Sequence, residues 1–372
     1  MRRSGCGWWA AAGWALVACC AFGCGRTSAI ADGAANADTV VVDDTAAGAD
    51  VANIDSENVD ASGTAADAGA PLAAAVAAAK TAAEADPTCT GLAPFYWEIG
   101  DVNGTLGGGS TGAGLIKADT ALNIASASKF FWGAYVVERF KADLSAVDAN
   151  AMTMRSGRTN FNTCMAGDTV ASCCGQPGAA GAATKNCDVT AAEVGFFNYG
   201  GAHFQQYAAD LGLGADDNSA LGADLKKLLG MELELSFTQP QPAGGGKASA
   251  ATYAGFLRKI LSGGLALHDH LGGAAVCTLP ATCPQAHSSP VPRAWHYSYG
   301  HWVEDDPNGD GAFSSPGLFG FYPWIDAGKQ YYGILAREAL RNLTGMLADA
   351  PYYQSVVCGE AIRHAFLGVA KP

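Results

Sequence analysis

Apolar side chains recur every three or four residues between positions 127 and 143, which is the spacing of a helix that buries one face. These apolar positions are Phe130, Phe131, Ala134, Val137 and Phe140. Three other stretches predict helices: an alanine-rich one over residues 71–85, one over residues 248–261 that ends at Ser-Gly-Gly, and one over residues 354–366. The chain from about residue 71 onward therefore has the helices of a folded domain.

Alternating and aromatic-rich stretches predict β-strands at both ends of the same region. They cover residues 92–100, 296–304, 317–326 and 331–337, with turns at Asp101-Val102-Asn103-Gly104 and over residues 326–330. Helical and loop patterns fill the middle. This distribution predicts an α/β (α+β) domain over residues 71–372, in which helices flank an antiparallel sheet built from both ends and a mostly helical subdomain is inserted at about 145–290.

Residues 1–24 have the features of a bacterial lipoprotein signal peptide. Arg2 and Arg3 supply positive charge, and residues 8–18 are almost purely apolar but too few to cross a bilayer comfortably. Leu16-Val17-Ala18-Cys19 has the form of a lipobox and the segment ending at Cys24 is a poorer candidate, so lipid is expected on Cys19 or Cys24. We expect an exported bacterial envelope lipoprotein (outer membrane, periplasm or cell surface) that meets the membrane only through this lipid. The alternative is an ordinary secretory signal and a secreted protein.

Residues 25–70 are predicted to be a disordered acidic tether. The segment is rich in Ala, Asp and Gly and lacks aromatic residues, so it cannot bury enough apolar surface to fold alone. Between Thr27 and Pro87 the chain has 11 Asp or Glu and one Lys, a net charge of −10 out of −13 for the whole chain. The folded part is therefore only mildly acidic, and it has no basic patch, which argues against nucleic acid as a partner.

Twelve cysteines occur in the chain, and four of them lie within residues 1–24. An even number in an exported chain is typical of disulfides, and the spacing of the other eight lacks the paired C-x-x-C units of a zinc site. Eight cysteines allow 105 pairings. We expect a small Cys277–Cys283 loop, a Cys89–Cys358 link between the ends of the domain, and pairing among Cys164, Cys173, Cys174 and Cys187.

Ser126-Ala127-Ser128-Lys129 lies where an extended stretch turns into the amphipathic helix at 127–143. A serine and a lysine three residues apart on a helix share one face, so the amine of Lys129 would lie beside the hydroxyl of Ser126. A partly desolvated lysine amine can take the proton of a serine hydroxyl and make it a nucleophile. The competing interpretation is a serine N-cap followed by a solvated surface lysine. The tetrapeptide alone cannot decide between the two.

Further short segments follow this one in a fixed order. They are Met154-Arg155-Ser156-Gly157, Phe197 to Phe204, Leu229-Gly230-Met231 with the stretch from Gly244 to Gly264, and Ser315-Pro316-Gly317-Leu318-Phe319-Gly320-Phe321. Together with Ile124 to Phe130 they make residues 90–340 similar to the β-lactamase-related serine hydrolases. This family includes class C β-lactamases, serine DD-peptidases and esterases of the same β-lactamase/transpeptidase-like fold.

The resemblance implies an acyl-enzyme mechanism that needs no cofactor. It makes Ser126 the nucleophile, Lys129 its base, and Tyr199 the group that relays the proton to the leaving group. It also places the oxyanion between the backbone N–H groups of Ser126 and Leu318, with Gly317 allowing the strand to approach the substrate closely.

Two departures from the family pattern bear on the substrate. With Tyr199 aligned to the family's tyrosine, Gly201 stands where asparagine is usual; the alternative register keeps Asn198 as the asparagine and puts Phe196 at the tyrosine. Ser315 stands where a lysine or histidine binds an anionic group, and a serine offers a hydrogen bond but no charge. We therefore expect an ester or neutral amide, either a small molecule or a peptide or cell-wall-like compound, in preference to a β-lactam.

Two segments carry partial metal-binding patterns. Asp306, Asn308 and Asp310 copy the first half of a calcium loop, but the twelfth position is Gly317 rather than glutamate. His268-Asp269-His270 has no third ligand nearby in sequence and is more typical of a polar helix end. We expect no metal and no cofactor.

Three functions are compatible with these patterns. The first is an exported serine hydrolase that cleaves an ester or amide through a Ser–Lys acyl-enzyme. The second is a non-catalytic surface lipoprotein of the same fold that binds a cell-wall fragment or a partner protein, which the changes at Gly201 and Ser315 favour. In the third, Ser126 is only a helix cap in a structural lipoprotein.

Overall fold

The computed structural model describes residues 69–165, 167–179, 181–341 and 347–369. The predicted signal peptide over residues 1–24, its candidate lipid sites Cys19 and Cys24, and nearly all of the tether over residues 25–70 lie outside the described residues. Among the described residues, no helix has both the length and the apolar character to span a bilayer.

The described chain starts with two helices and a hairpin, and then enters the central helix of the molecule. These elements are α1 (Gly69–Ala85), α2 (Pro87–Thr90), β1 (Tyr96–Asp101), β2 (Thr105–Ser110), β3 (Leu122–Asn123), the 3-10 helix η1 (Ala125–Ala127) and α3 (Ser128–Phe140). Every residue of α3 from Ser128 to Val137 is buried, as the apolar spacing predicts. The helix ends at Lys141, which adopts a left-handed conformation with φ 49°.

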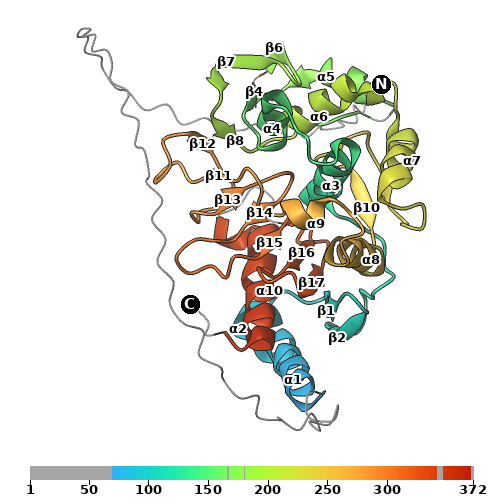
Figure 1. Ribbon diagram of the computed structural model, residues 1–372, viewed down its shortest axis with the longest axis vertical. Coiled ribbons are helices and arrows are strands. Elements are labelled where there is room, and N and C mark those ends of the chain that lie inside the picture. The colour runs from blue at the N-terminus through green and yellow to red at the C-terminus, as the bar shows by residue number, and fades with distance from the viewer. Residues whose placement is uncertain (1–68, 166, 180, 342–346, 370–372) are drawn as a thin grey trace, which may run out of the picture. The chain divides into compact units, whose positions relative to one another are not determined.

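The inserted segment combines short helices with short strands, and its part from α4 to α6 lies at the top of Figure 1. Its elements are α4 (Ala146–Met152), β4 (Ser156–Arg158), α5 (Val170–Cys174), β5 (Pro177–Gly178), β6 (Gly181–Lys185), β7 (Val189–Val194), β8 (Phe197–Asn198), α6 (Ala202–Ala208), η2 (Ala209–Leu213), α7 (Asn218–Leu229), β9 (Ser236–Phe237), β10 (Gly246–Ala248), α8 (Ala250–Leu261), α9 (Leu267–His270), β11 (Val276–Cys277) and β12 (Ala286–Ser288). The strands β4 with β7, β5 with β6, and β8 with β12 form two-stranded pairs. The segment is therefore less purely helical than the sequence pattern predicts.

The last part of the chain returns to the main sheet. It contains β13 (His296–Tyr297), β14 (Trp302–Val303), β15 (Phe313–Ser314), β16 (Tyr322–Ile325), β17 (Tyr331–Ala336), η3 (Leu347–Asp349) and α10 (Pro351–Leu367). The eight strands run in the order β11-β13-β14-β15-β16-β17-β1-β2, and each neighbouring pair within it is antiparallel (Figure 1). Since β1 pairs with β17, with Ile99 opposite Gly333, the two ends of the domain meet in one sheet. This arrangement confirms the predicted α/β fold class.

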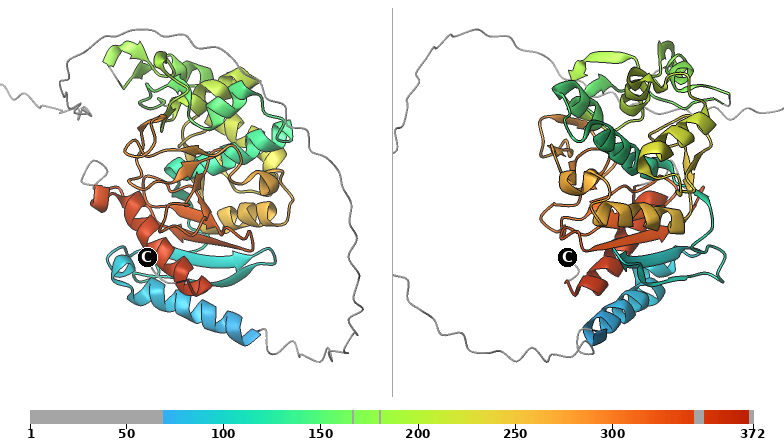
Figure 2. Two further views of the ribbon diagram at one scale, coloured as in Figure 1. Left: turned by 60° about the vertical axis from the view of Figure 1, so that its left-hand side comes forward. Right: turned by 45° about the vertical axis from the view of Figure 1, so that its right-hand side comes forward.

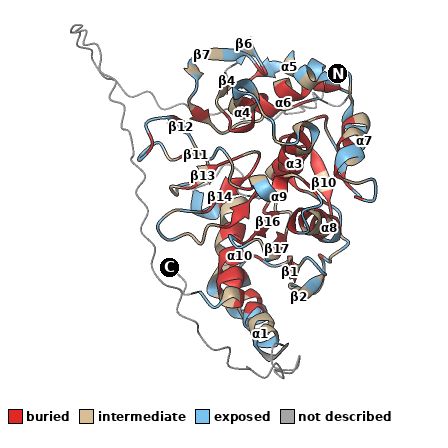
Figure 3. Cartoon of the chain, viewed as in Figure 1, coloured by how far each residue is buried: buried red, intermediate tan, exposed pale blue. Residues whose placement is uncertain are grey.

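Helices cover both faces of the sheet. α1 and α10 pack against each other and α10 lies on β16 and β17, whereas α8 packs on β1 and β17 from the opposite face (Figures 1 and 2). All four residues of β16 and five of the six in β17 are accordingly buried. Figure 3 shows that the buried residues gather along α3, α8, α10 and these strands.

Two predicted strands differ from the observed ones. Residues 296–304 form two short strands, because the chain reverses at Ser298–His301, where the N–H of Ser298 donates to the carbonyl of His301 at 2.8 Å. Gly300 supplies the left-handed conformation of this turn, with φ 78°. In the predicted strand at 317–326, only Tyr322–Ile325 is a strand; Gly317 to Gly320 form a turn that faces the site described below.

Four disulfides cross-link the described chain. Cys89 pairs with Cys358 and Cys277 with Cys283, and in the inserted segment Cys164 pairs with Cys173 and Cys174 with Cys187. These links confirm the expected pairings and select one of the three ways in which the four cysteines of the insert could pair. Four disulfides indicate an oxidising, extracellular or periplasmic location.

Candidate active site

Ser126 lies in η1, immediately before α3, and is half-buried. The turn that carries it is held from both sides: the hydroxyl of Ser128 donates to the carbonyl of Ala125 at 2.6 Å and accepts from the N–H of Gly246 at 3.0 Å. Ala125 has a positive φ of 44°, a conformation that a residue with a Cβ adopts only when its surroundings impose it. The hydroxyl of Ser126 is thus presented by a rigid, tightly held turn.

The amine of Lys129 lies against Ser126. Its nitrogen donates to the Oγ of Ser126 at 2.9 Å and to the backbone carbonyl of Ala243 at 2.7 Å. The side chain is buried, and burial lowers the pKa of Lys129 from 10.5 to about 7. Near neutral pH this amine is therefore uncharged in a large fraction of molecules and can accept a proton.

Tyr199 lies next to Ser126 and Lys129. The nitrogen of Lys129 lies 4.7 Å from the centre of the Tyr199 ring, and the ring stacks on Trp302 with centroids 5.2 Å apart. Burial raises the pKa of Tyr199 to about 12, although hydrogen bonds with the side chains of Ser126 and Trp302 lower it in part. Tyr199 therefore keeps its proton over the physiological range and can donate it.

This geometry favours the register that places Tyr199 at the family's tyrosine. In the other register, Asn198 and Phe196 would face the nucleophile. Instead the amide of Asn198 donates to Glu193 at 2.6 Å, and the ring of Phe196 stacks on His287 at 4.1 Å. Both side chains are thus engaged with partners of their own.

At Gly201, where the family has asparagine, there is no room for a side chain. A Cβ at this position would lie 2.8 Å from the ring of Phe161. Phe161 therefore fills part of the space that the asparagine would need. Gly201, expected from the sequence to contact the substrate, is not among the residues that line the pocket described below.

The turn after β15 forms the facing wall. A Cβ at Gly317 would meet the carbonyl oxygen of Ile124 at 2.1 Å, so only glycine permits this turn to lie against the nucleophile segment. Next to it, Leu318 is exposed and lines the pocket, and its N–H has no acceptor among the residues that the structure describes. The N–H of Ser126 lies in the first turn of η1, where a helix has no acceptors for its own N–H groups.

Ser315 has a different position from the one expected of a substrate-binding residue. It is 2% exposed, and its hydroxyl donates to the backbone carbonyl of Ser126 at 3.0 Å. The side chain therefore holds the nucleophile's backbone.

A pocket of about 70 Å³ opens at Ser126. Its lining is mostly apolar or aromatic and contains no ionised side chain: Ser126, Tyr199, Pro290, Val291, Trp302, Pro316, Leu318 and Tyr352. The hydroxyl of Tyr352 in α10 donates to the carbonyl of Pro290 at 2.7 Å, which joins two walls of the pocket. Sequence reasoning missed Pro290, Val291, Trp302 and Tyr352, because no local pattern links them to Ser126.

The candidate calcium residues have other partners. Arg293 and the indole N–H of Trp295 bind Asp306 at 2.7 and 2.6 Å. Asp310 accepts from Arg363 at 2.6 and 2.8 Å, and His364 Nε2 lies 3.1 Å from it. Guanidinium groups thus neutralise the carboxylates that a calcium ion would need.

The histidine motif also lacks the geometry of a metal site. His268 Nδ1 lies 2.9 Å from the carbonyl of Ile260, and the side chain of Asp269 is 83% exposed. Over the described ranges of the chain, no cluster of three or more His, Cys, Asp or Glu side chains could hold a metal ion.

No family model and no curated protein matches the sequence. Solved structures do match its fold. A candidate β-lactamase from Bacteroides dorei has a TM-score of 0.54 at 18% identity, over 73% of this chain and 93% of the other. A D-stereospecific amidohydrolase from a Streptomyces species has a TM-score of 0.51 at 13% identity, over 79% and 99%.

A third structure, of SurE with D-Leu, has a TM-score of 0.52 at 15% identity, over 82% of this chain and 78% of the other. At these identities the likeness concerns the fold. The chain therefore has the β-lactamase-type fold of the serine hydrolase family that its motifs resemble.

Proposed function

We propose that the protein is a serine hydrolase that cleaves an uncharged ester or a neutral amide through an acyl-enzyme on Ser126. The observation that carries this proposal is the 2.9 Å contact between the hydroxyl of Ser126 and the buried amine of Lys129, whose pKa is lowered to about 7. A surface lysine would be solvated, whereas Lys129 is buried and has no carboxylate partner among the described residues.

Acylation starts when Lys129 takes the proton of Ser126 and the Oγ attacks the substrate carbonyl. The new C–O bond gives a tetrahedral oxyanion, for which the N–H groups of Ser126 and Leu318 are the donors. Each such donor typically contributes ~3–4 kcal/mol to transition-state stabilisation. When the intermediate collapses, the bond to the leaving group breaks and the acyl group stays on Ser126.

The two pKa values divide the proton transfers between Lys129 and Tyr199. At pH 7 the amine, with a pKa of about 7, accepts a proton readily, while the phenol, with a pKa of about 12, stays protonated. Lys129 is therefore the base, and Tyr199 passes a proton to the leaving group and is reprotonated from Lys129. Water then attacks the acyl-enzyme by the same route in reverse and releases the acid.

The pocket lining argues for an uncharged substrate. Among the described residues, those that line the pocket at Ser126 include no lysine, arginine or histidine, and Ser315 is engaged with the backbone of Ser126. A carboxylate desolvated in an apolar pocket without a partner is strongly disfavoured. We infer that small esters and neutral amides bind better than β-lactams, and that the chain acts outside the cytoplasm, anchored by lipid at Cys19 or Cys24.

Covalent labelling tests the proposal. The full chain is exposed to a fluorophosphonate and to a fluorescent penicillin, and the adduct is located by peptide mass spectrometry. We expect the fluorophosphonate on Ser126, no adduct in Ser126→Ala, and turnover of p-nitrophenyl esters in preference to nitrocefin. A folded protein that no probe labels, and whose Ser126→Ala variant behaves as wild type, would refute the enzyme.

A further inference from the structure

The buried amine of Lys129 has a second hydrogen-bond acceptor, the uncharged backbone carbonyl of Ala243. Ala243 is 1% exposed and lies in the connection between β9 and β10 (residues 238–245). The hydrogen bond from Lys129 to this carbonyl is 2.7 Å long, shorter than the one to Ser126. The position of the 238–245 connection therefore decides where the amine sits and how well water is excluded from it.

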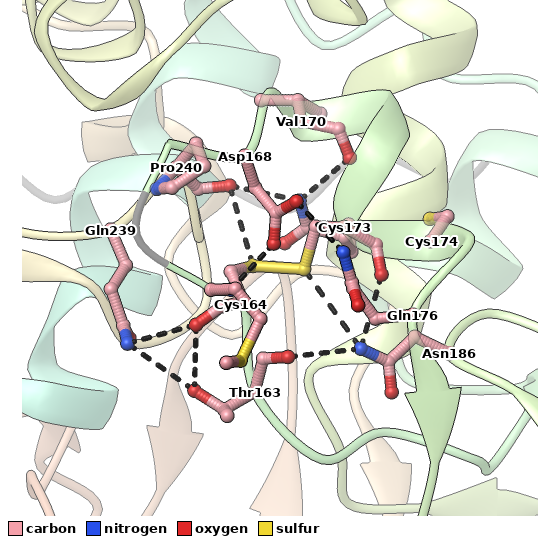
Figure 4. Close-up of a disulfide and its surroundings, with 12 residues drawn as sticks. Thr163, Cys164, Asp168, Val170, Cys173, Cys174, Gln176, Asn186, Gln239 and Pro240 are labelled. Atoms are coloured by element: carbon pink, nitrogen blue, oxygen red, sulfur yellow. Dashed lines mark hydrogen bonds between the residues drawn. A yellow bond between two sulfur atoms is a disulfide. The ribbon is translucent and has the colours of Figure 1, made fainter. Parts of the chain in front are cut away.

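The beginning of this connection is fixed by residues that come earlier in the inserted segment. The side-chain nitrogen of Gln239 donates to the carbonyl of Cys164 at 3.1 Å and to the hydroxyl of Thr163 at 3.3 Å. The carbonyl of Pro240 accepts from the buried amide of Gln205 at 2.8 Å. Figure 4 shows the side chain of Gln239 directed toward Thr163 and Cys164, beside the disulfide.

Thr163 and Cys164 are in turn held by a covalent link. Cys164 is bonded to Cys173 at the end of α5, and both are buried. Asn186 bridges the same two places, since its amide nitrogen donates to the carbonyls of Thr163 at 3.2 Å and of Cys173 at 3.1 Å (Figure 4). A continuous set of contacts thus runs from the disulfide through Gln239 to the carbonyl that binds the amine.

We propose that Gln239 and the Cys164–Cys173 cross-link position Lys129, by holding the 238–245 connection so that the carbonyl of Ala243 faces the amine and covers it. Neither touches the substrate, so they are positioning groups. This inference rests on the proposed function of Ser126 and Lys129, and it adds to that function a disulfide on which the base depends.

The expected signature is a change in acid–base behaviour. Burial is the cause of the low pKa of Lys129, so a loosened connection that admits water raises this pKa toward 10.5. The ring of Tyr199 lies 4.7 Å from the amine, and burial, together with the charge of Lys129, lowers the pKa of His203; their pKa values are about 12 and about 4, so neither changes charge near pH 7. In the cross-linked segment the charged group is Asp168, which Ser172 and Gln176 hold at 2.9 and 3.0 Å.

The first test replaces Gln239 by leucine, which removes both amide donors. Its matched control is Gln241→Leu in the same connection, since the side chain of Gln241 has no hydrogen bond within the part of the chain that the structure describes. For Gln239→Leu we expect the acid limb of kcat to move up by about one pH unit, kcat at pH 7 to fall about fivefold to tenfold, and KM to stay within about twofold. Gln241→Leu should leave all three unchanged.

The second test removes the cross-link with Cys164→Ser/Cys173→Ser. The control, Cys174→Ser/Cys187→Ser, removes the neighbouring disulfide of the same insert. We expect the acid limb of kcat to shift in Cys164→Ser/Cys173→Ser and to stay in place in the control. An unshifted limb in both Gln239→Leu and Cys164→Ser/Cys173→Ser, or equal shifts in a test variant and its control, would overturn the proposal.

A direct titration separates this proposal from the proposed function. The pKa of Lys129 is followed by NMR of labelled lysine side chains in the full chain, which requires no turnover. A wild type that hydrolyses nothing refutes the proposed function. A pKa of Lys129 that is the same in wild type and Gln239→Leu refutes the positioning role, whatever the activity.

Discussion

The hydroxyl of Ser315 donates a hydrogen bond to the backbone carbonyl of Ser126 across 3.0 Å. The residue that follows β15 and a residue of η1, just before α3, are thereby joined at the nucleophile although they are far apart in the sequence. The family pattern has a cation at this place, and here a buried hydroxyl supports the backbone instead.

Ser315→Ala should therefore weaken both the fold and the proposed activity. Losing this bond costs about 1 kcal/mol of unfolding free energy, and a less fixed nucleophile should lower kcat roughly threefold to tenfold. The matched control is Ser314→Ala, because the buried hydroxyl of Ser314 has no partner among the described residues. Urea unfolding and ester hydrolysis measure both effects. Equal losses in the two variants would show that the contact with Ser126 has no special role.

The pH dependence of the proposed reaction follows from Lys129. The active form needs the neutral amine, and the pKa of about 7 means that protonation removes this form as pH falls. We expect kcat/KM for a neutral ester to drop about tenfold per pH unit below pH 7 and to level off above pH 8. Lys129→Arg should abolish this limb together with the activity, since a guanidinium does not release its proton. A flat profile between pH 5 and pH 9 would contradict Lys129 as the base.

The burial of Lys129 should also lower the unfolding free energy of the protein at neutral pH. Between about pH 7 and pH 10.5 the folded state binds fewer protons at this amine than the unfolded state, so the wild type loses stability as pH falls through that window. Lys129→Met escapes this cost but leaves the carbonyl of Ala243 without a donor. We expect a net gain of about 1–3 kcal/mol in unfolding free energy at pH 7, which disappears by about pH 10.5. Denaturant unfolding at both pH values checks the difference. A variant less stable than wild type at pH 7 would mean that the amine is solvated.

Gly317 should tolerate no side chain. Gly317→Ala places a Cβ 2.1 Å from the carbonyl oxygen of Ile124, so the turn or the nucleophile segment must move. We expect a loss of about 2–4 kcal/mol of unfolding free energy and nearly complete loss of fluorophosphonate labelling at Ser126. Gly91→Ala is the control, because nothing lies within 4 Å of the added carbon and φ is −78°. Full labelling of Gly317→Ala would contradict the tight approach of the two segments.

The stabilising effect of the network around Asp310 should depend on the positive charge of Arg363 and should not depend on calcium. Burial tends to raise the pKa of Asp310, but hydrogen bonds from His364 and Arg363 and the charge of Arg363 hold it well below its usual range. The stabilisation is therefore present above about pH 4 and is lost as pH falls further.

Arg363→Met should cost about 3–5 kcal/mol of unfolding free energy, since Glu304 and Asp310 would stay buried without a cation. Lys259→Met, which removes an exposed pair with Glu232, should cost less than about 1 kcal/mol. Calcium or a chelator should leave the Tm of the wild type unchanged. A rise in Tm on adding calcium would restore the metal loop as an explanation.

Features that depend on local spacing were accessible from the sequence. The three-residue interval between Ser126 and Lys129 implied their contact, because a helical turn brings such side chains together. The short interval between Cys277 and Cys283 likewise implied their bond. Strand patterns at both ends of the domain implied the antiparallel sheet.

Features that depend on distant segments were not accessible. Tyr352 and Pro290 line the same pocket although they come from α10 and from the connection after β12. The carbonyl of Ala243 carries no side-chain signal at all, because a backbone acceptor is present at every residue. The actual partner of Asp310 in the partial calcium pattern was also not accessible, because Arg363 lies 53 residues away in the sequence.

The bond between Cys89 and Cys358 spans 269 residues, and the residues of the candidate site lie between them in the sequence. A protease that cuts the backbone once between Ser126 and Ser315 would thus produce two fragments that remain one molecule. The nucleophile would stay tethered to the strands that face it until a reductant is added. Nicked material should consequently run as a single species on a non-reducing gel.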